Sequence, residues 1–172
     1  MIYLLDANVL ITAHNSYYPI DDVPEFWAWL LHQGANGVVK MPQEKFEEVR
    51  DGKDEDLLCK WVTAEEFKDH LLFDEEVNPD LVARVVAEGY APDPNDQELN
   101  DQEIAQIGRD PFLIAYALAA PAERCVVTTE VSKPSVRRQN RHIPDVCITM
   151  GVTCYNTFQM TKALGFKTGW SK

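Results

Sequence analysis

The chain has 172 residues, which is the length of a single domain with a substantial core. A hydrophobic content of 45% and a charged content of 26% are typical of a globular protein and exclude a disordered chain. No apolar run reaches the length of a membrane span, and the N-terminus lacks the basic segment of a signal peptide. We therefore expect no membrane association and a cytoplasmic location.

The formal net charge of −12 by itself argues against nucleic acid as a partner, because Lys and Arg contacts to phosphate supply most non-specific affinity. The charge is unevenly distributed along the chain. Residues 44–110 hold 7 Lys and Arg against 21 Asp and Glu, whereas residues 124–172 hold 8 against 2. The C-terminal part is therefore basic, and a local field of that sign can bind a polyanion although the whole chain is acidic.

The pattern of apolar residues predicts alternating strands and helices. Short apolar runs that end at polar or turn-forming residues predict strands at 2–5, 37–41, 125–128 and 152–155. Helical spacing and cap residues predict helices from residue 7 onward, at 25–33, 42–50, within 54–69, at 79–88, 100–108 and 110–119, after 144, and at 157–164. This alternation implies a three-layer α/β/α sandwich with a mainly parallel central sheet. We expect one domain over residues 1–172, with an acidic helical insert at about 53–98.

The four cysteines show no close spacing of the kind that metal sites use. Two of them, Cys125 and Cys154, fall in strand-like apolar runs. We therefore expect buried, reduced thiols and neither a disulfide framework nor a zinc site.

Asp6 ends the first predicted strand, directly before a helix. In an open parallel α/β sheet, ligands bind in the crevice beyond the carboxyl ends of the strands, where Asp6 would lie. The alternative is that Asp6 only caps the helix that follows. Other carboxylates at similar junctions favour the first interpretation.

Asp110 directly precedes Pro111 and has the position of an N-cap for the most apolar helix, and Glu130 follows the third predicted strand. The helix after the second strand carries Glu44, Glu47 and Glu48, and its periodicity does not show which of them points inward. If Asp6, Asp110, Glu130 and one of these glutamates converge, their repulsion is costly without a cation. Such hard oxygen ligands suit Mg²⁺ or Mn²⁺.

Four segments carry a resemblance to the PIN-domain ribonucleases. Residues 4–11 (LLDANVLI) are similar to the opening of that family, where a strand ends in Asp followed two residues later by Asn or Ser. Residues 48–52 (EVRDG) resemble its Glu-Leu-x-x-Gly motif, and residues 109–118 (RDPFLIAYAL) its Ala-Asp-x-x-Ile-Ala-x-Ala-Leu motif. Residues 127–130 (VTTE) resemble its Val-Thr-x-Asp motif, with Glu in place of Asp. The four segments follow the order of the family and span most of the chain.

The resemblance implies a PIN-like fold and a divalent-metal-dependent ribonuclease with Mg²⁺ or Mn²⁺ as cofactor. It implies that the catalytic, metal-binding acids are Asp6, Glu48, Asp110 and Glu130, and it favours Glu48 among the three glutamates. Asn8 and Thr128 would support the first carboxylate and position water. Asp145 would add a fifth acid to the site, or would only cap the helix after Pro144.

The basic loop, Ser132–His142, directly follows Glu130 and contains no acid. It is the best candidate for contacts to the RNA backbone, through Lys133, Arg137, Arg138 and Arg141; the alternative is an ordinary solvated loop. Single-stranded or structured RNA is the expected substrate, because its backbone can be splayed into a cleft. The resemblance also implies the toxin of a toxin–antitoxin pair, with an antitoxin protein and a homodimer as the further partners.

Two other functions remain open from the sequence. In an aspartyl-nucleophile phosphotransferase Asp6 would accept the phosphate, but such enzymes place a second Asp two residues later, where this chain has Asn8. In a non-catalytic PIN-like module the basic loop would recruit RNA or protein without cleavage. Acid-labile phosphate on Asp6 would identify the first, and an undiminished effect of Asp6→Asn would favour the second.

Overall fold

Four short parallel strands form the centre of the structure, a computed structural model that describes residues 1–172 except 53–55, 92, 94–96 and 172. The strands are β1 (Ile2–Leu5), β2 (Val39–Lys40), β3 (Arg124–Val127) and β4 (Thr153–Tyr155). Their order is β2-β1-β3-β4, and every pairing is parallel. Because the chain moves from β1 to one neighbour and later returns to the other side of β1, the topological switch lies between β1 and β3.

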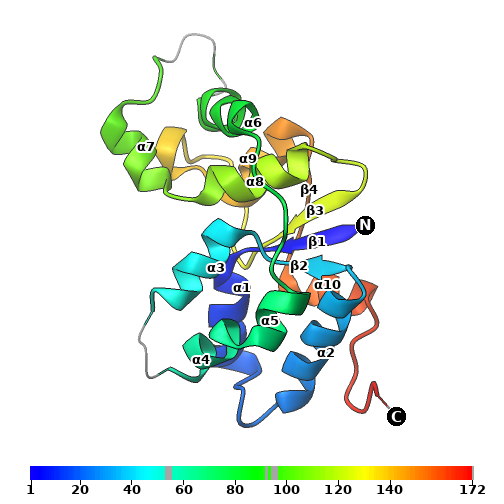
Figure 1. The fold of residues 1–172 in the computed structure, drawn as a ribbon. Coiled ribbons are helices and arrows are strands. Elements are labelled where there is room, and N and C mark those ends of the chain that lie inside the picture. Colours follow the sequence, from blue (N-terminus) through cyan, green and yellow to red (C-terminus); the bar gives the residue numbers. More distant parts are fainter. Residues whose placement is uncertain (53–55, 92, 94–96, 172) are drawn as a thin grey trace.

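Helices cover both faces of the sheet (Figure 1). On one side lie α1 (Ala7–Thr12), α2 (Pro24–Ala35), α3 (Gln43–Arg50), α4 (Leu57–Thr63), α5 (Glu65–His70) and α10 (Thr157–Ala163). On the other side lie α6 (Pro79–Arg84), α7 (Asp101–Ile107), α8 (Asp110–Leu118) and α9 (Ile143–Met150). This arrangement is the three-layer α/β/α sandwich that the sequence predicted.

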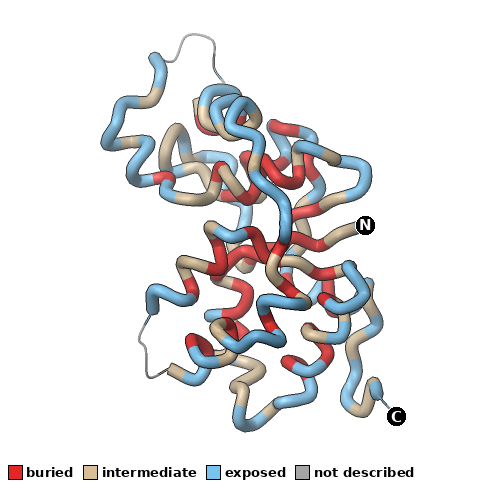
Figure 2. The backbone as a smooth tube through the Cα atoms, viewed as in Figure 1, coloured by how far each residue is buried: buried red, intermediate tan, exposed pale blue. Residues whose placement is uncertain are grey.

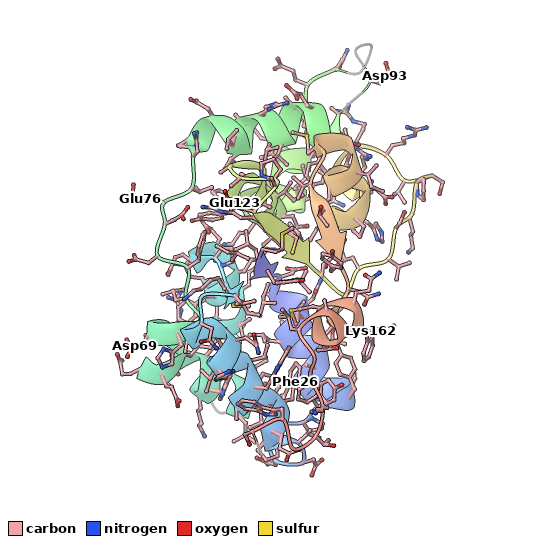
Figure 3. All side chains as sticks on the ribbon, turned by 90° about the vertical axis from the view of Figure 1, so that its right-hand side faces the viewer. Phe26, Asp69, Glu76, Asp93, Glu123 and Lys162 are labelled. Atoms are coloured by element: carbon pink, nitrogen blue, oxygen red, sulfur yellow. The ribbon has the colours of Figure 1, made fainter. Side chains whose placement is uncertain are left out.

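Successive side chains of a strand point to opposite faces of the sheet, so the core has two parts, one on each face. In β1, Tyr3 and Leu5 pack with α1–α5, whereas Leu4 packs with the layer of α8 and α9. Figure 2 shows buried residues along the strands and on the helix faces that point toward them. Figure 3 shows the side chains that fill both layers, with Phe26 in the layer of α2. Phe26 is stacked on Tyr18 with ring centroids 4.4 Å apart.

The acidic insert contributes to both helical layers. Helices α4 and α5 pack beside α3 and α2, and Met41 forms an isolated parallel bridge with Leu72. The chain then crosses from α5 to α6 on the other side of the sheet (Figure 1). The start of the insert, at 53–55, lies outside the described residues.

Two expected elements differ in detail. The helix predicted at 79–88 is α6 followed by a π-helical turn, Val85–Tyr90, that packs against α9. Gly89 allows this approach, because a Cβ there would lie 2.7 Å from Val146 Cγ1. The basic loop contains a single 3₁₀ turn, Arg138–Asn140.

None of the described helices combines the length and the apolar composition that a bilayer span requires. All four cysteines are free thiols in this structure, and three of them are buried. Cys154 is only partly buried, because it lies on the edge strand β4.

Candidate functional site

Asp6 lies at the switch point, directly after β1. Its backbone takes the N-cap position of α1, but its side chain makes no capping hydrogen bond. Instead Asp6 Oδ2 accepts a hydrogen bond of 2.8 Å from Thr128 Oγ1, at the end of β3. Asp6 is 3% exposed. The geometry therefore does not support the interpretation of Asp6 as a simple helix cap.

Lys45 stands at the centre of the site, and nothing in the sequence analysis singled it out. Its Nζ lies 3.2 Å from Asp6 Oδ1, 2.7 Å from Asp110 Oδ1, and 3.1 and 3.2 Å from the two oxygens of Glu48. Lys45 is 1% exposed. We call the group of Lys45 with Asp6, Glu48 and Asp110 the carboxylate centre.

Helix α3 directs Lys45 inward. Its buried residues are Lys45, Phe46 and Val49, and Glu48 lies three residues after Lys45 on the same face. Burial opposes the charged ammonium and lowers the pKa of Lys45, but Asp6 and Asp110 outweigh this effect, so that the net shift raises its pKa. Lys45 is therefore a fixed positive charge.

The structure separates the three glutamates of α3. Glu48 contacts Lys45, whereas Glu47 forms an ion pair of 2.9 Å with Arg109. Burial raises the pKa of the Tyr116 phenol, and the neighbouring carboxylate of Glu44 raises it further. Only Glu48 therefore faces the carboxylate centre.

Asp110 is the first residue of α8, and Arg109 takes the N-cap position. The sequence placed Asp110 at the N-cap itself, which is wrong, because its carboxylate does not turn back to the helix backbone but reaches Lys45. The positive end of the helix dipole faces the same point. Burial raises the pKa of Asp110 although Lys45 lowers it. The cost of holding this acid charged is therefore only partly offset.

Glu130 lies beside the carboxylate centre without contacting Lys45. Its Oε2 accepts a hydrogen bond of 2.8 Å from the Ile143 amide and lies 3.9 Å from His142 Nδ1. Burial raises the pKa of Glu130, the Ile143 amide lowers it, and the negative charges of Asp110 and Asp6 raise it further. The fourth acid therefore belongs to the same electrostatic environment, while its backbone contact holds it to the start of α9.

Asn8 and Thr128 tie the ends of β1 and β3 together. Asn8 Nδ2 donates a hydrogen bond of 3.1 Å to Thr128 Oγ1, and Asn8 Oδ1 accepts one of 2.9 Å from the Thr129 amide. Since Thr128 in turn donates to Asp6, the two residues fix the orientation of that carboxylate.

Asp145 is buried, at 5% exposed, but serves the basic loop and not the carboxylate centre. Its two oxygens accept hydrogen bonds from Ser132 Oγ at 2.5 Å and from the Lys133 amide at 2.7 Å. Asp145 therefore anchors the start of the loop that follows Glu130. The sequence did not distinguish this role, because it depends on a contact across thirteen residues.

Two arginines of the basic loop are engaged within the protein. Arg138 forms an ion pair of 2.8 Å with Glu103. Arg141 donates to the carbonyl of Gly89 and, at 2.9 Å, to Thr149 Oγ1. Lys133 and Arg137 are exposed. Of the four predicted RNA contacts, these two side chains are therefore the ones directed to solvent.

Tyr90, at the end of the π-helical turn, also borders the site. It is 1% exposed, and its hydroxyl has no hydrogen-bond partner in the part of the chain that the structure describes. Burial raises the pKa of Tyr90, and the charges of Asp110 and Glu130 raise it further. A buried hydroxyl without a partner is costly, which indicates a missing ligand or water. No sequence pattern identified Tyr90, because an aromatic residue at a helix end usually belongs to the core.

Asp6, Glu48 and Asp110 supply carboxylate oxygens, which are the hard donors that Mg²⁺ and Mn²⁺ prefer. Within the described residues, no three Asp, Glu, His or Cys side chains are arranged as the ligands of a metal ion. The point on which Asp6, Glu48 and Asp110 converge is filled by the Lys45 ammonium. The chemistry of the site therefore suits a cation, and one cation is already supplied by the chain.

A cavity of about 490 Å³ opens on the side of Glu130. Its lining includes Glu130 and Ser132 together with the aromatic side chains Tyr17, Tyr155 and Phe158. Phe158 is 56% exposed, and its ring centroid lies 5.1 Å from that of Tyr17. An aromatic surface thus adjoins the acidic site.

Comparison with known protein families identifies one match that covers nearly the whole chain. Residues 3–168 match the family described as a domain of unknown function (DUF4411). No curated protein matches the chain. The chain therefore belongs to the DUF4411 family.

Proposed function

We propose that this protein is a metal-dependent endoribonuclease that hydrolyses phosphodiester bonds of single-stranded or structured RNA. The observation that carries the proposal is the convergence of Asp6, Glu48 and Asp110 on one point at the sheet switch, with Glu130 beside them. Acids from four separate segments are costly to gather, so a site that does so is expected to bind a cation.

The residues of the site have different roles in the proposed reaction. Asp6, Asp110 and Glu130 border the position for Mg²⁺ or Mn²⁺, and Thr128 and Asn8 hold Asp6 in place. A bound divalent ion polarises a phosphate and lowers the pKa of an attacking water. Glu130 would add the fourth carboxylate from the side of α9, where the Ile143 amide holds its Oε2.

The surroundings of the site suit RNA. Lys133 and Arg137 are exposed on the loop after Glu130, where they can contact phosphates. Tyr17, Tyr155 and Phe158 line the adjoining cavity, and aromatic rings of this kind stack unpaired bases. Together they support a strand path from the basic loop, past Glu130, into the aromatic cavity.

The biological setting follows from the same proposal. As the toxin of a toxin–antitoxin pair, the protein would act in the cytoplasm and be inhibited by an antitoxin protein. Exposed apolar side chains beside the site, Val131 and Phe158, offer a surface for that protein or for a second copy of the chain in a homodimer.

RNA cleavage by matched variants tests the proposal. Wild type is expected to cut a mixed single-stranded RNA in Mg²⁺ or Mn²⁺ and to lose this activity in chelator. Glu48→Gln and Asp110→Asn are expected to lose at least about 100-fold of the rate, as for removal of a key electrostatic group. Glu47→Gln is the control, because its acid lies on the same helix but pairs with Arg109. Equal cleavage by all three variants would overturn the assignment.

One observation favours a second candidate, the non-catalytic binding module. Lys45 already neutralises part of the carboxylate centre, so the fold is stable without a metal if the acids serve only structure. In that case RNA binding persists in chelator and Asp6→Asn keeps the biological effect. The phosphotransferase alternative gains no such support, because Lys45 and Thr128 engage both oxygens of Asp6.

A further inference from the structure

The cavity of about 490 Å³ lies where the strands β3 and β4 end. Its lining includes Glu130 after β3, Tyr155 at the end of β4, and Phe158 near the start of α10. Cavities of roughly 300 to 1,000 Å³ hold small organic molecules, and such sites combine apolar walls with a few polar groups. The volume is therefore sufficient for one base of a nucleic acid.

The aromatic rings that line the cavity are backed by other rings of the protein. The ring centroid of Tyr17 lies 5.1 Å from that of Phe158 and 5.1 Å from that of Tyr18. The ring of Tyr155 lies 5.6 Å from that of Tyr3. Phe158 is nonetheless 56% exposed. An exposed ring that a second ring supports is a surface on which a base can stack.

Two side-chain amides at the start of α10 add hydrogen-bond donors to the lining. Asn156 and Gln159 form a capping box, in which each side-chain oxygen accepts a hydrogen bond of 2.8 Å from the backbone amide of the other residue. In the described part of the chain, no acceptor occupies their side-chain amide nitrogens. The edge of an unpaired base carries acceptors for such donors.

The rim of the cavity is basic, although the whole chain is acidic. Lys133 follows the lining residue Ser132, and Lys162 lies one turn after Phe158 on the same face of α10. Both lysines are exposed, and Figure 3 shows Lys162 on the side of the molecule that also carries the basic loop. From residue 131 to the C-terminus the only acid is Asp145, which is buried. The rim therefore complements a ligand with phosphates.

The cavity and the carboxylate centre lie along the same edge of the sheet. The Asp6 amide donates a hydrogen bond of 2.9 Å to the Val127 carbonyl, and the Thr128 amide donates one of 3.1 Å to the Tyr155 carbonyl. The ends of β1, β3 and β4 are therefore neighbours, and two strand spacings, about 10 Å, separate Asp6 from Tyr155 across the sheet. A strand with one base in the cavity can present an adjacent phosphate to the acids.

We infer that this cavity holds the base of one unpaired nucleotide of the RNA, so that the protein requires an unpaired nucleotide beside the bond that it cuts. The inference rests on the proposed function, and it narrows the substrate to RNA with single-stranded segments. The bases of a continuous duplex are paired and stacked, so none of them can enter the cavity.

Binding of RNA in chelator tests the inference without cleavage. A labelled uridine RNA of about ten nucleotides should bind the wild type more tightly than the matching duplex does, as measured by fluorescence anisotropy. Phe158→Leu removes the ring but keeps an apolar side chain, and it should bind the single strand at least about five-fold more weakly. Phe158→Tyr should bind as the wild type does. Leu57→Ala, which alters an exposed apolar side chain at the start of α4, is the control and should also leave binding unchanged.

Each result bears on one of the two proposals. Equal binding by Phe158→Leu and wild type, with metal-dependent cleavage intact, would overturn this inference and leave the proposed function standing. Equal cleavage of single strand and duplex would do the same. Weaker binding by Phe158→Leu, with no cleavage by the wild type in Mg²⁺ or Mn²⁺, would support the base site and overturn the nuclease. A wild-type dimer that dissociates in Phe158→Leu and binds no single strand would assign the cavity to a second copy of the chain and overturn the inference.

Discussion

The charged groups of the carboxylate centre and those of the basic loop have different kinds of partners. At the loop, Arg138 pairs with Glu103, and Asp145 accepts hydrogen bonds from Ser132 and the Lys133 amide, whereas the side chains of Lys133 and Arg137 are exposed. In the carboxylate centre three acids share one ammonium, and burial raises the pKa of two of them. Glu130 stands between the two regions, with one oxygen on the Ile143 amide.

This difference separates structural charges from functional ones. The loop is anchored because Arg138, Arg141 and Asp145 have partners within the protein. The carboxylate centre instead has excess negative charge, which a bound cation would reduce. The sequence left the basic loop open between an RNA-binding segment and an ordinary solvated loop. Two of its four basic side chains turn out to hold the fold together.

The largest expected effect comes from removing the shared ammonium. Lys45→Met leaves Asp6, Glu48 and Asp110 without their common partner, and breaking a buried ion pair in this way costs about 3 kcal/mol or more. Urea unfolding in chelator should show this loss at pH 7. A midpoint equal to that of wild type would mean that the three acids do not depend on Lys45.

The second-largest loss of stability is expected from replacing Asp145, which anchors the start of the basic loop. Asp145→Asn replaces a carboxylate that accepts two hydrogen bonds with an amide that can accept only one of them, so a loss of about 2 kcal/mol is expected. Trypsin should then cut faster after Arg137, which is exposed. Asp80→Asn, in the exposed first turn of α6, is the control. An unchanged cleavage pattern would argue against the anchoring role.

A smaller loss of stability is expected from removing the hydrogen bonds that join the ends of β1 and β3. Thr128→Val removes the donor to Asp6 and the acceptor of Asn8 at nearly constant volume, which should cost about 1 to 2 kcal/mol. It should also slow RNA cleavage, because Asp6 loses its orientation. Thr63→Val loses a hydroxyl that donates to the Cys59 carbonyl in α4, away from the site, and should retain full activity. Equal activities of the two variants would remove Thr128 from the site.

The smallest effect is expected from the ion pair between Arg138 and Glu103, and it should appear as a dependence of stability on pH. Arg138, together with the Asn100 amide, lowers the pKa of Glu103 from 4.5 to about 2. The stabilisation from this pair is complete above pH 4.5 and is lost as the pH falls toward 2. Between these values the unfolding midpoint should fall more in wild type than in Glu103→Gln. Parallel profiles would show that the pair does not contribute.

Most of the fold was predictable because periodicity and caps are local signals. The strand Ile2–Leu5 has the predicted bounds, and a capping box of Asn100 with Glu103 opens α7 within the helix predicted at 100–108. The π-helical turn after Arg84 was not predictable, since it follows from the close packing of Gly89 against Val146 in a distant helix. Element types were therefore easier to predict than their tertiary adjustments.

The site was only partly predictable. Their positions at the ends of strands identified Asp6 and Glu130 as site candidates, but no sequence pattern identified Lys45. One signal could have identified it. Lys45 precedes the core residue Val49 by four positions and therefore shares its helix face. A site that gathers several acids also needs a cation, and Lys45 was the nearest one available.

The most direct test of this account is the anomalous scattering of Mn²⁺ in crystals of the wild-type protein. We expect a Mn²⁺ peak bordered by Asp110 and Glu130, with Lys45 Nζ still in contact with Asp6 and Glu48. A peak only at a distance from these residues, or no peak at saturating Mn²⁺, would contradict the claim that this cluster of acids is a cation site.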